Sequence, residues 1–529
     1  MLSNMVKSKG VLFALLGILL LASFFRLWQL DTLPPGLWPD EAINATTAVE
    51  ILQTGEFQVF YPENHGREGF FFLLISFAFG LFGVSVWAFK IVPALIGILT
   101  VLGQFLLTRE LFGQIAATRI HAAKIALLSS FFLAVSVWHI MFSRIGFRAI
   151  LLPLVLVFSS YFLFRGMRTK KILDFILAGL IFGLGFHTYI SFRLGALAVA
   201  LALLLWLILA IKERWGKEFL FKASAFSLFA LLSASPILWH FLNTPEDFLF
   251  RASGISVFAQ EQPLKALGES TLKHLAMFNI AGDQNWRHNV AGQAQLPAVV
   301  GIFFLIGLGA FMANTIKAFA VLVKTRMQGE ASRAFLIGAF VLAWLFFLLL
   351  PGVLTSEGIP HALRVIGMIP ALYLLAGFGA LISFRFLLRL PRGQYMQAGA
   401  ISLVLLGTTL LSFHSYFILW KQSPELEESF TLRFMDVGHE LNSYPKEIQK
   451  YVVMSEGDLP REVPRFIQYT ENRQEAIYLH PEEVATTVFM PGDLLFTMNK
   501  EARFLALARE QYPNGILHER ERIWIYEIQ

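Results

Sequence analysis

The sequence has 529 residues, of which 56% are hydrophobic and only 15% are charged, against about a quarter charged in a typical soluble domain. Repeated apolar runs of about 20 residues exclude an ordinary soluble protein and predict a polytopic all-α membrane protein. The net charge of +6 does not imply nucleic acid, because the lysines and arginines lie mostly in short loops, where they set membrane topology. The chain has no cysteine, so neither a disulfide nor a catalytic thiolate is expected.

The first apolar run, residues 11–30, follows Lys7 and Lys9. It is long for a signal peptide and no small-residue cleavage site follows it, so we interpret it as a retained span that starts in the cytoplasm. The apolar runs predict about eleven transmembrane helices in all. The other ten are residues 86–108, 122–142, 148–165, 172–190, 194–211, 221–240, 296–316, 333–351, 363–384 and 396–419.

The run at 69–83, "GFFFLLISFAFGLFG", is short for a membrane span. If it does not cross, every later loop rich in Lys and Arg lies on the same side as Lys7 and Lys9. If it crosses, all of those loops move to the outside, against the positive-inside rule. We therefore expect an interfacial or re-entrant helix within the first external loop, 31–85. The N-terminus is then cytoplasmic and the C-terminus extracytoplasmic.

The tail after the last span has an ordinary soluble composition. Proline and charge in "KQSPELEES" mark a boundary, which predicts a transmembrane domain over 1–420 and an extracytoplasmic domain over 421–529. Four segments alternate apolar and polar residues, and "EARFLALAREQY" has a helical pattern, so the tail is predicted to be a small α/β domain. The four segments are "YVVMSE", "ATTVFM", "DLLFTM" and "RIWIYEI".

Two adjacent carboxylates, Asp40 and Glu41, lie in the first external loop within "WPDEA". One interpretation is structural: Asp40 would cap a helix that continues to Gly55, and Glu41 would favour the positive end of its dipole. The other interpretation is chemical, and both can hold, because a carboxylate at a helix start is rigidly placed.

Further polar residues are predicted on the same side of the membrane. Arginines at that depth suit a phosphate group, because the guanidinium binds two of its oxygens. The alternative for each arginine is contact with lipid headgroups, and a lone histidine is more often structural. The residues are Glu63, His65, Arg67 and Glu68 in "ENHGREG", Arg144 and Arg148 in "SRIGFR", and His361 and Arg364 in "PHALR".

These motifs, in this order and on one side, resemble the GT-C superfamily of membrane glycosyltransferases. The nearest likeness is to the dolichyl-phosphate-mannose–protein mannosyltransferase-like family, which includes bacterial lipid A aminoarabinose transferases. "WPDEA" matches its early Asp-Glu, "SRIGFR" its SR-x-x-R turn, and "PHALRVIGMIP" its H-x-R-Y span entrance. Two departures are Val365, where Tyr is common, and the absence of an acidic residue soon after the SR-x-x-R turn.

The resemblance implies sugar transfer from a polyprenyl-phosphate-linked donor to an acceptor hydroxyl on a lipid, glycan or protein, at the outer face of a bacterial plasma membrane. Asp40 is then the expected base, with Glu41 assisting by positioning or metal contact. Arg144, Arg148 and Arg364 are the expected phosphate ligands, and a divalent metal ion is an alternative for this role. His65, Arg67, Glu68 and His361 would form the rim.

The external loop 241–295 contains "FNIAGDQNWRHNVAGQ", whose amides and Trp286 suit sugar binding or a solvated loop equally. Two competing functions remain. A transporter or flippase of lipid-linked saccharides would need ionisable residues at mid-membrane depth, where few occur. An O-antigen-ligase-like enzyme would place its key residues in a large late loop and would not need the early Asp-Glu pair.

Overall fold

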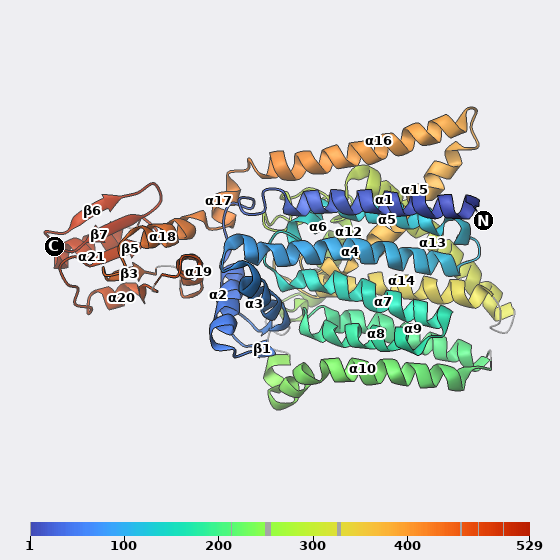
Figure 1. Ribbon diagram of the computed structural model, residues 1–529, viewed down its shortest axis with the longest axis horizontal. Helices are drawn as coiled ribbons and strands as arrows, with labels where there is room; N and C mark the ends of the chain where they lie inside the picture. Colours follow the sequence, from blue (N-terminus) through green and yellow to red (C-terminus); the bar gives the residue numbers. More distant parts are fainter. Residues whose placement is uncertain are drawn as a thin grey trace.

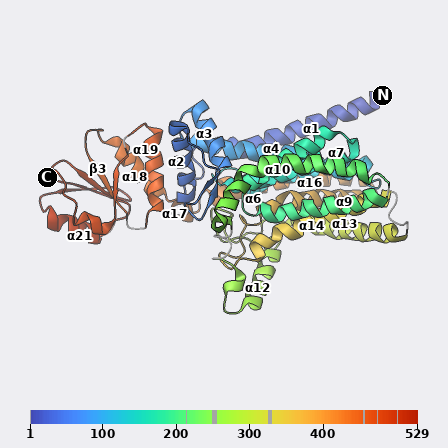
Figure 2. The same ribbon diagram turned by 90° about the horizontal axis from the view of Figure 1, so that it is seen from below.

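The computed structural model describes residues 2–212, 214–248, 255–324, 330–454, 457–473, 475–500 and 502–529. Figure 1 shows a bundle of long helices with a small sheet domain beyond one end and the N-terminus at the other. The view at right angles shows the same arrangement (Figure 2). The predicted class, a helical membrane protein with a small C-terminal α/β domain, is confirmed.

Nine helices within the described ranges are long and apolar enough to cross a membrane. They coincide with nine of the eleven predicted spans. They are α1 (Leu2–Leu27), α4 (Val86–Gln114), α7 (Leu151–Thr169), α9 (Phe192–Lys212), α10 (Gly216–Asn243), α13 (Ala298–Lys324), α14 (Glu330–Val353), α15 (Ile369–Leu387) and α16 (Gly393–Phe413), the last of which continues in a π-helical turn.

The other two predicted spans form shorter helices. Residues 122–142 divide into α5 (Ala122–Ala134) and α6 (Val137–Phe142), and the Ser136 hydroxyl caps α6 by accepting a hydrogen bond from the His139 N–H. Residues 172–190 form α8 (Ile172–Leu184) and a 3-10 turn. A helix of 13 residues rises about 20 Å, less than the hydrocarbon thickness. Both are held by neighbours, α5 by α4 and α15, and α8 by α7 and α10.

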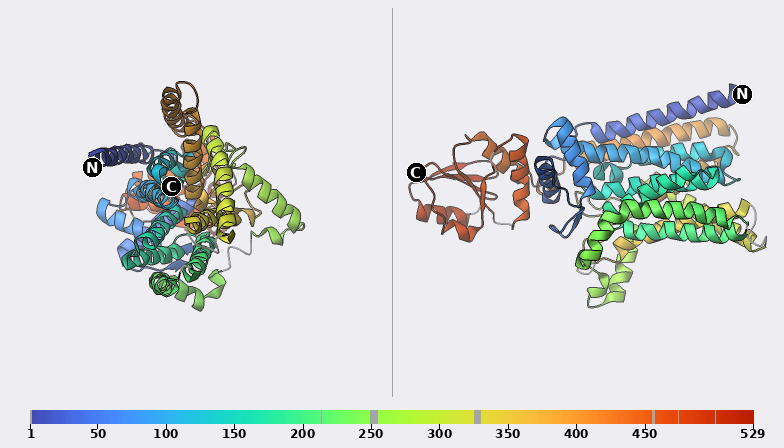
Figure 3. Two further views of the ribbon diagram at one scale, coloured as in Figure 1. Left: turned by 90° about the vertical axis from the view of Figure 1, so that its right-hand side faces the viewer. Right: turned by 60° about the horizontal axis from the view of Figure 1, so that its bottom comes forward.

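The bundle has a buried centre and a lipid-accessible rim. In the apolar stretch of α15, 89% of residues are buried, and 72% are buried in α4, whereas only 17% are buried in α10 and 22% in α16. Viewed along the bundle, α1, α10 and α16 lie at its periphery (Figure 3). The peripheral helices therefore present their apolar side chains to the bilayer.

The segment 31–85, between α1 and α4, folds against the end of the bundle nearest the sheet domain (Figure 1). It contains α2 (Pro39–Thr54), a two-stranded ribbon of β1 (Phe60–Tyr61) and β2 (Arg67–Glu68), and α3 (Phe70–Phe82), which packs on α2 and α4. The two ends of the chain lie at opposite ends of the bundle, as an odd number of crossings requires. This arrangement agrees with a 69–83 segment that does not cross.

The C-terminal domain contains a five-stranded mixed sheet in the order β4-β3-β5-β7-β6. Strands β3, β4 and β5 are parallel, and β7 is antiparallel to β5 and β6. The strands are β3 (Lys450–Val453), β4 (Ile477–Leu479), β5 (Leu494–Thr497), β6 (Ile516–Glu519) and β7 (Trp524–Glu527), and the helices are α17 (Glu425–Ser429), α18 (Leu432–Ser443), α19 (Glu462–Thr470), α20 (Pro481–Val484) and α21 (Ala502–Gln511).

One predicted strand of this domain is wrong. The segment "ATTVFM", residues 485–490, is a turn and an irregular stretch after α20. The hydroxyls of Thr486 and Thr487 both bond to the backbone carbonyl of Glu483, and such local bonds compete with strand pairing. The edge strand of the sheet next to β3 is β4.

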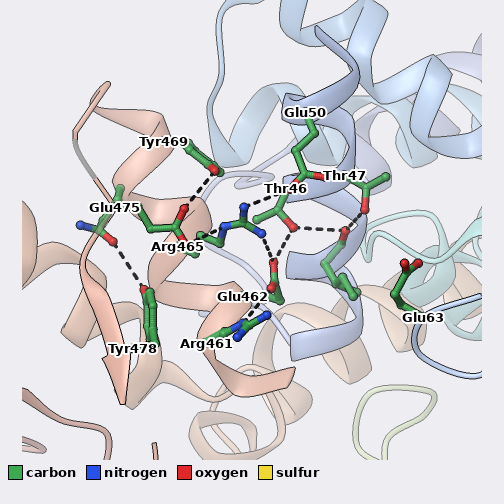
Figure 4. A network of polar contacts seen from close by, with 12 residues as sticks. Thr46, Thr47, Glu50, Glu63, Arg461, Glu462, Arg465, Tyr469, Glu475 and Tyr478 are labelled. Carbon is green, nitrogen blue, oxygen red and sulfur yellow. Dashed lines mark hydrogen bonds and ion pairs between the residues drawn. The ribbon is translucent and has the colours of Figure 1, made fainter. Parts of the chain in front are cut away.

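The C-terminal domain docks on α2 through α19 (Figure 4). The Thr46 hydroxyl donates a hydrogen bond of 2.6 Å to Glu462, and Arg465 lies 3.0 Å from Glu50 across the interface. Beside this polar network, Phe466 of α19 packs on Phe79, with ring centroids 5.9 Å apart. The helix that carries Asp40 is thus held between the bundle and the C-terminal domain.

Candidate active site at the end of the bundle

Asp40 lies in the first turn of α2, but it does not cap the helix. The N-cap position is Trp38, and the carboxylate of Glu41 accepts a hydrogen bond of 3.1 Å from the Trp38 N–H. The expectation that Asp40 caps α2 is therefore wrong, because Glu41 takes that role. The helix does end at Gly55, whose φ of 75° suits glycine.

Asp40 and Arg148 line one cavity of about 90 Å³. One oxygen of Asp40 accepts a hydrogen bond of 2.9 Å from Asn64. The guanidinium of Arg148 is positioned by Glu68 at 2.6 Å and by the carbonyl of Gly66 at 2.9 Å. The other lining residues are Asn44, His65, Arg67, Phe147, Ala149, Tyr189 and Leu363. A carboxylate and a cation are therefore placed on the walls of the same small cavity.

Glu41 points away from this cavity into the protein. It is completely buried, and its second oxygen accepts a hydrogen bond of 2.7 Å from the N–H of Gly146. Burial raises the pKa of Glu41 above its ordinary value, against the opposing effects of Lys90 and the two backbone N–H groups. Glu41 thus fixes the "SRIGFR" turn, and with it Arg148, to the start of α2, which is a positioning role.

The raised pKa of Glu41 predicts a pH dependence of stability. The folded state binds the Glu41 proton more tightly than the unfolded state, so the carboxyl favours folding most at low pH and loses this effect as pH rises through the folded pKa. We expect the free energy of unfolding of the wild type, relative to Glu41→Gln, to fall as the pH rises above the ordinary pKa of a glutamate and through the raised pKa of folded Glu41. Thermal unfolding of both proteins in detergent measures this difference. A difference that does not change with pH would contradict the assignment.

Arg144 is placed differently from its predicted role. It is completely buried, and its guanidinium donates to four backbone carbonyls. These belong to Phe25, Trp28, Gln29 and Leu33, at 2.8–3.1 Å. It also lies over the rings of Tyr416 and Phe417. Because both terminal nitrogens of its guanidinium bind these carbonyls, Arg144 holds the exit of α1, and it lines neither the cavity of Asp40 nor the cavity of Arg364.

The predicted rim residues lie around the Asp40 cavity, apart from His361. His65 and Arg67 line the cavity, and Glu68 binds Arg148. Arg67 is only 2% exposed and donates to Asn44 and Thr47 of α2. Burial, and secondarily the neighbouring Arg148, lowers the pKa of Arg67 to about 10.

Arg364 lies in a second cavity of about 420 Å³ that shares Tyr189 with the first. Its guanidinium bonds to the Thr355 hydroxyl at 2.8 Å and to the Glu357 carbonyl at 2.6 Å. The lining is otherwise mainly apolar, with a second cation, Arg193. Two adjoining cavities, a polar one with Asp40 and a larger apolar one with arginines, could together take a molecule with a polar head and an apolar chain.

Sequence reasoning missed three residues of this region. Tyr189 and Arg193 lie in "HTYISFR", at the junction of the predicted spans 172–190 and 194–211, and this position was the available signal. Arg287 comes from the 241–295 loop, and its guanidinium lies 3.6 Å from the Trp38 ring centroid. Burial lowers the pKa of Arg287, and the negative charges of Asp40 and Glu41 oppose that shift.

Comparisons with known proteins agree with the resemblance in the sequence. Residues 70–240 match the family model described as dolichyl-phosphate-mannose-protein mannosyltransferase. YkcB of Bacillus subtilis, provisionally named a mannosyltransferase, is 24% identical over 238 residues, which are 43% of this chain and 31% of YkcB. The match therefore spans about a third of the relative's length.

Among solved structures, ArnT from Cupriavidus metallidurans superposes over 98% of both chains. The TM-score is 0.55 for ArnT bound to undecaprenyl phosphate and 0.57 for its apo state, at 15% and 14% identity. The helical bundle, the folded first loop and the C-terminal domain at one end together define this fold, which is similar to that of ArnT. Residues 70–240 carry the sequence similarity to the mannosyltransferase family model.

Proposed function

We propose that this protein transfers a hexose or pentose from a polyprenyl-phosphate-linked donor to an acceptor hydroxyl at the extracytoplasmic face of the membrane. The observation that carries the proposal is the shared cavity of Asp40 and Arg148, next to an apolar cavity with Arg193 and Arg364. A lipid-linked sugar phosphate has the same division into a polar reacting end and an apolar tail.

The distribution of charge supports the proposed orientation. The loops that join α4 to α5, α7 to α8, α9 to α10 and α15 to α16 are rich in Lys and Arg, and all lie at the N-terminal end of the bundle. The positive-inside rule assigns that end to the cytoplasm of a bacterial plasma membrane. The Asp40 cavity, the 241–295 loop and the domain over 421–529 then lie outside, where a lipid, glycan or protein acceptor is available.

The residues suit a single displacement with inversion at the anomeric carbon. Asp40 takes the proton of the acceptor hydroxyl while the hydroxyl oxygen forms the new glycosidic bond to the anomeric carbon. The bond between the anomeric carbon and the phosphate oxygen breaks, and polyprenyl phosphate leaves with that electron pair. Arg148 stabilises the charge on the leaving phosphate, while Glu68 keeps its guanidinium oriented. Arg364 and Arg193, which line the larger cavity, would contact the phosphate from that side.

The experiment uses the purified protein in proteoliposomes with a polyprenyl-phosphate sugar labelled in the sugar, and a membrane extract as acceptor. We expect label to move to the acceptor fraction and polyprenyl phosphate to be released in equal amount. Label that crosses the bilayer while still attached to its lipid would indicate a flippase. Transfer from lipid diphosphate-linked oligosaccharides alone would favour the ligase-like alternative. Either result would contradict the proposal.

Arg148 offers a prediction about donor binding. In Arg148→Ala we expect the KM for the lipid-linked donor to rise by about 10- to 100-fold, because a charge-assisted contact to phosphate is lost. The double variant Arg148→Ala/Glu68→Ala is the control, since it removes the carboxylate that the single variant leaves unpaired. A double variant with the wild-type KM would show that Arg148 only neutralises Glu68.

A further inference from the structure

Three side chains near the Asp40 cavity, Asp283, His288 and His361, come together at a point that the proposed reaction does not use. Each offers one ligand atom, and the three atoms lie within 4.8 Å of one another. Asp283 and His288 belong to the loop between α12 (Pro263–Ala276) and α13, and His361 belongs to the loop between α14 and α15. We propose that these three residues form a binding site for a divalent transition-metal ion of the zinc class.

The distances fit a metal site that needs little rearrangement. The Nδ1 atom of His288 lies 3.0 Å from the Oδ2 atom of Asp283, and the ring centroids of His288 and His361 are 4.9 Å apart. Two imidazoles and one carboxylate are a common ligand set for Zn²⁺, which leaves a fourth position for water. This donor set is softer than the oxygen sets that favour Mg²⁺ or Ca²⁺.

Two of the three ligands are almost completely buried, and hydrogen bonds hold Asp283 and the backbone of His361 in place. Asp283 is 2% exposed and His288 is 3% exposed. Asp283 accepts hydrogen bonds from the N–H groups of Asn285 at 2.8 Å and Ala362 at 2.7 Å. The backbone of His361 is fixed by its N–H, which donates to His274 at 3.1 Å. Such surrounding contacts are typical of metal ligands.

A hydrogen-bonded Asp–His pair without metal is the alternative explanation. It accounts for the contact of Asp283 with His288. A metal ion would in addition use the second imidazole, His361, which comes from a different loop and packs against the ring of His288. The rings of Phe142 and His288 lie 5.4 Å apart, so one side of the cluster is apolar, which strengthens metal–ligand interactions by excluding water.

The position of the cluster suggests what the ion does. Arg287 precedes His288 and lies over Trp38, next to the start of α2. Leu363, two residues after His361, lines the cavity of Asp40. The ion would therefore join the loop that places Leu363 on the wall of the candidate active site to a loop that packs against the start of α2. It is separate from the acidic pair Asp40–Glu41, and its presence does not depend on the proposed sugar transfer.

The test measures metal binding by the full-length protein in detergent, without any activity assay. After treatment with a chelator and dialysis against Zn²⁺, we expect one zinc ion per chain by elemental analysis. His288→Ala and His361→Ala should lose it, and Asp283→Asn should bind it more weakly. His439→Ala, which removes an exposed histidine of the C-terminal domain, should retain it.

A second measurement covers variants that fold poorly. The chelated wild type is titrated with Co²⁺, and a site with two imidazoles should give visible absorption that Zn²⁺ abolishes. Added Zn²⁺ should also raise the midpoint of thermal unfolding of the wild type but not of His361→Ala. A chelated wild type that binds no more Zn²⁺ than His288→Ala, with no Co²⁺ absorption, would overturn the proposal.

Discussion

Replacing Asp40 with asparagine is expected to reduce the rate of sugar transfer by about two to four orders of magnitude. Asparagine keeps the shape of the side chain but cannot take the proton from the hydroxyl group that receives the sugar. The hydrogen bond from Asn64 can be retained by the amide oxygen, so folding should change little. Initial rates in proteoliposomes and donor binding are measured for both proteins. Binding of the donor should survive.

The control for Asp40→Asn is Glu56→Gln, which removes an exposed carboxylate just beyond the end of α2. It should transfer sugar at the wild-type rate. If Asp40→Asn also transfers at that rate, Asp40 is not the base, and its place in the cavity has another purpose.

Arg144→Ala is expected to destabilise the protein by about 3–5 kcal/mol, because several buried carbonyls lose a charged donor at once. Arg144→Lys should recover only part of this loss, since one ammonium nitrogen cannot replace both guanidinium nitrogens, one of which donates to Phe25 and the other to Leu33 and its neighbours. Thermal unfolding in detergent measures both variants. The control is Arg389→Ala, which changes an exposed arginine at the other end of the bundle.

The same variants distinguish a structural Arg144 from a phosphate ligand. If Arg144 bound the donor phosphate, Arg144→Ala would unfold near the wild-type temperature and show a raised KM for donor. That outcome would contradict the contacts of Arg144 with the exit of α1.

Hydropathy and charge were sufficient to locate the helices of the bundle. They also predicted that 69–83 does not cross, because the charge of the flanking loops depends on the number of crossings. They overestimated the lengths of α5 and α8, since a helix enclosed by neighbours need not span the bilayer with an unbroken apolar run. In the C-terminal domain, the alternation of apolar and polar residues identified β3, β5 and β7. It could not show that the hydroxyls of Thr486 and Thr487 bond to the nearby carbonyl of Glu483.

The site was harder to predict, because its geometry depends on long-range contacts. The sequence placed Arg144 and Arg148 on the same turn, and only the fold shows that Arg144 points to α1 while Arg148 faces the cavity. Likewise, adjacent Asp40 and Glu41 point in different directions because α2 starts at Pro39. Asp283 and His361 are 78 positions apart by their residue numbers, and no local pattern connects them.

The most direct measurement is an experimental structure of the protein with polyprenyl phosphate bound. It tests whether the cavity of Asp40 and Arg148 is where a lipid phosphate goes. We expect the phosphate oxygens to contact the Arg148 guanidinium, the prenyl chain to enter the apolar cavity beside Tyr189, and Asp40 to face the phosphate across the space left for the sugar. A phosphate bound at a place lined by neither Asp40 nor Arg148 would contradict the account.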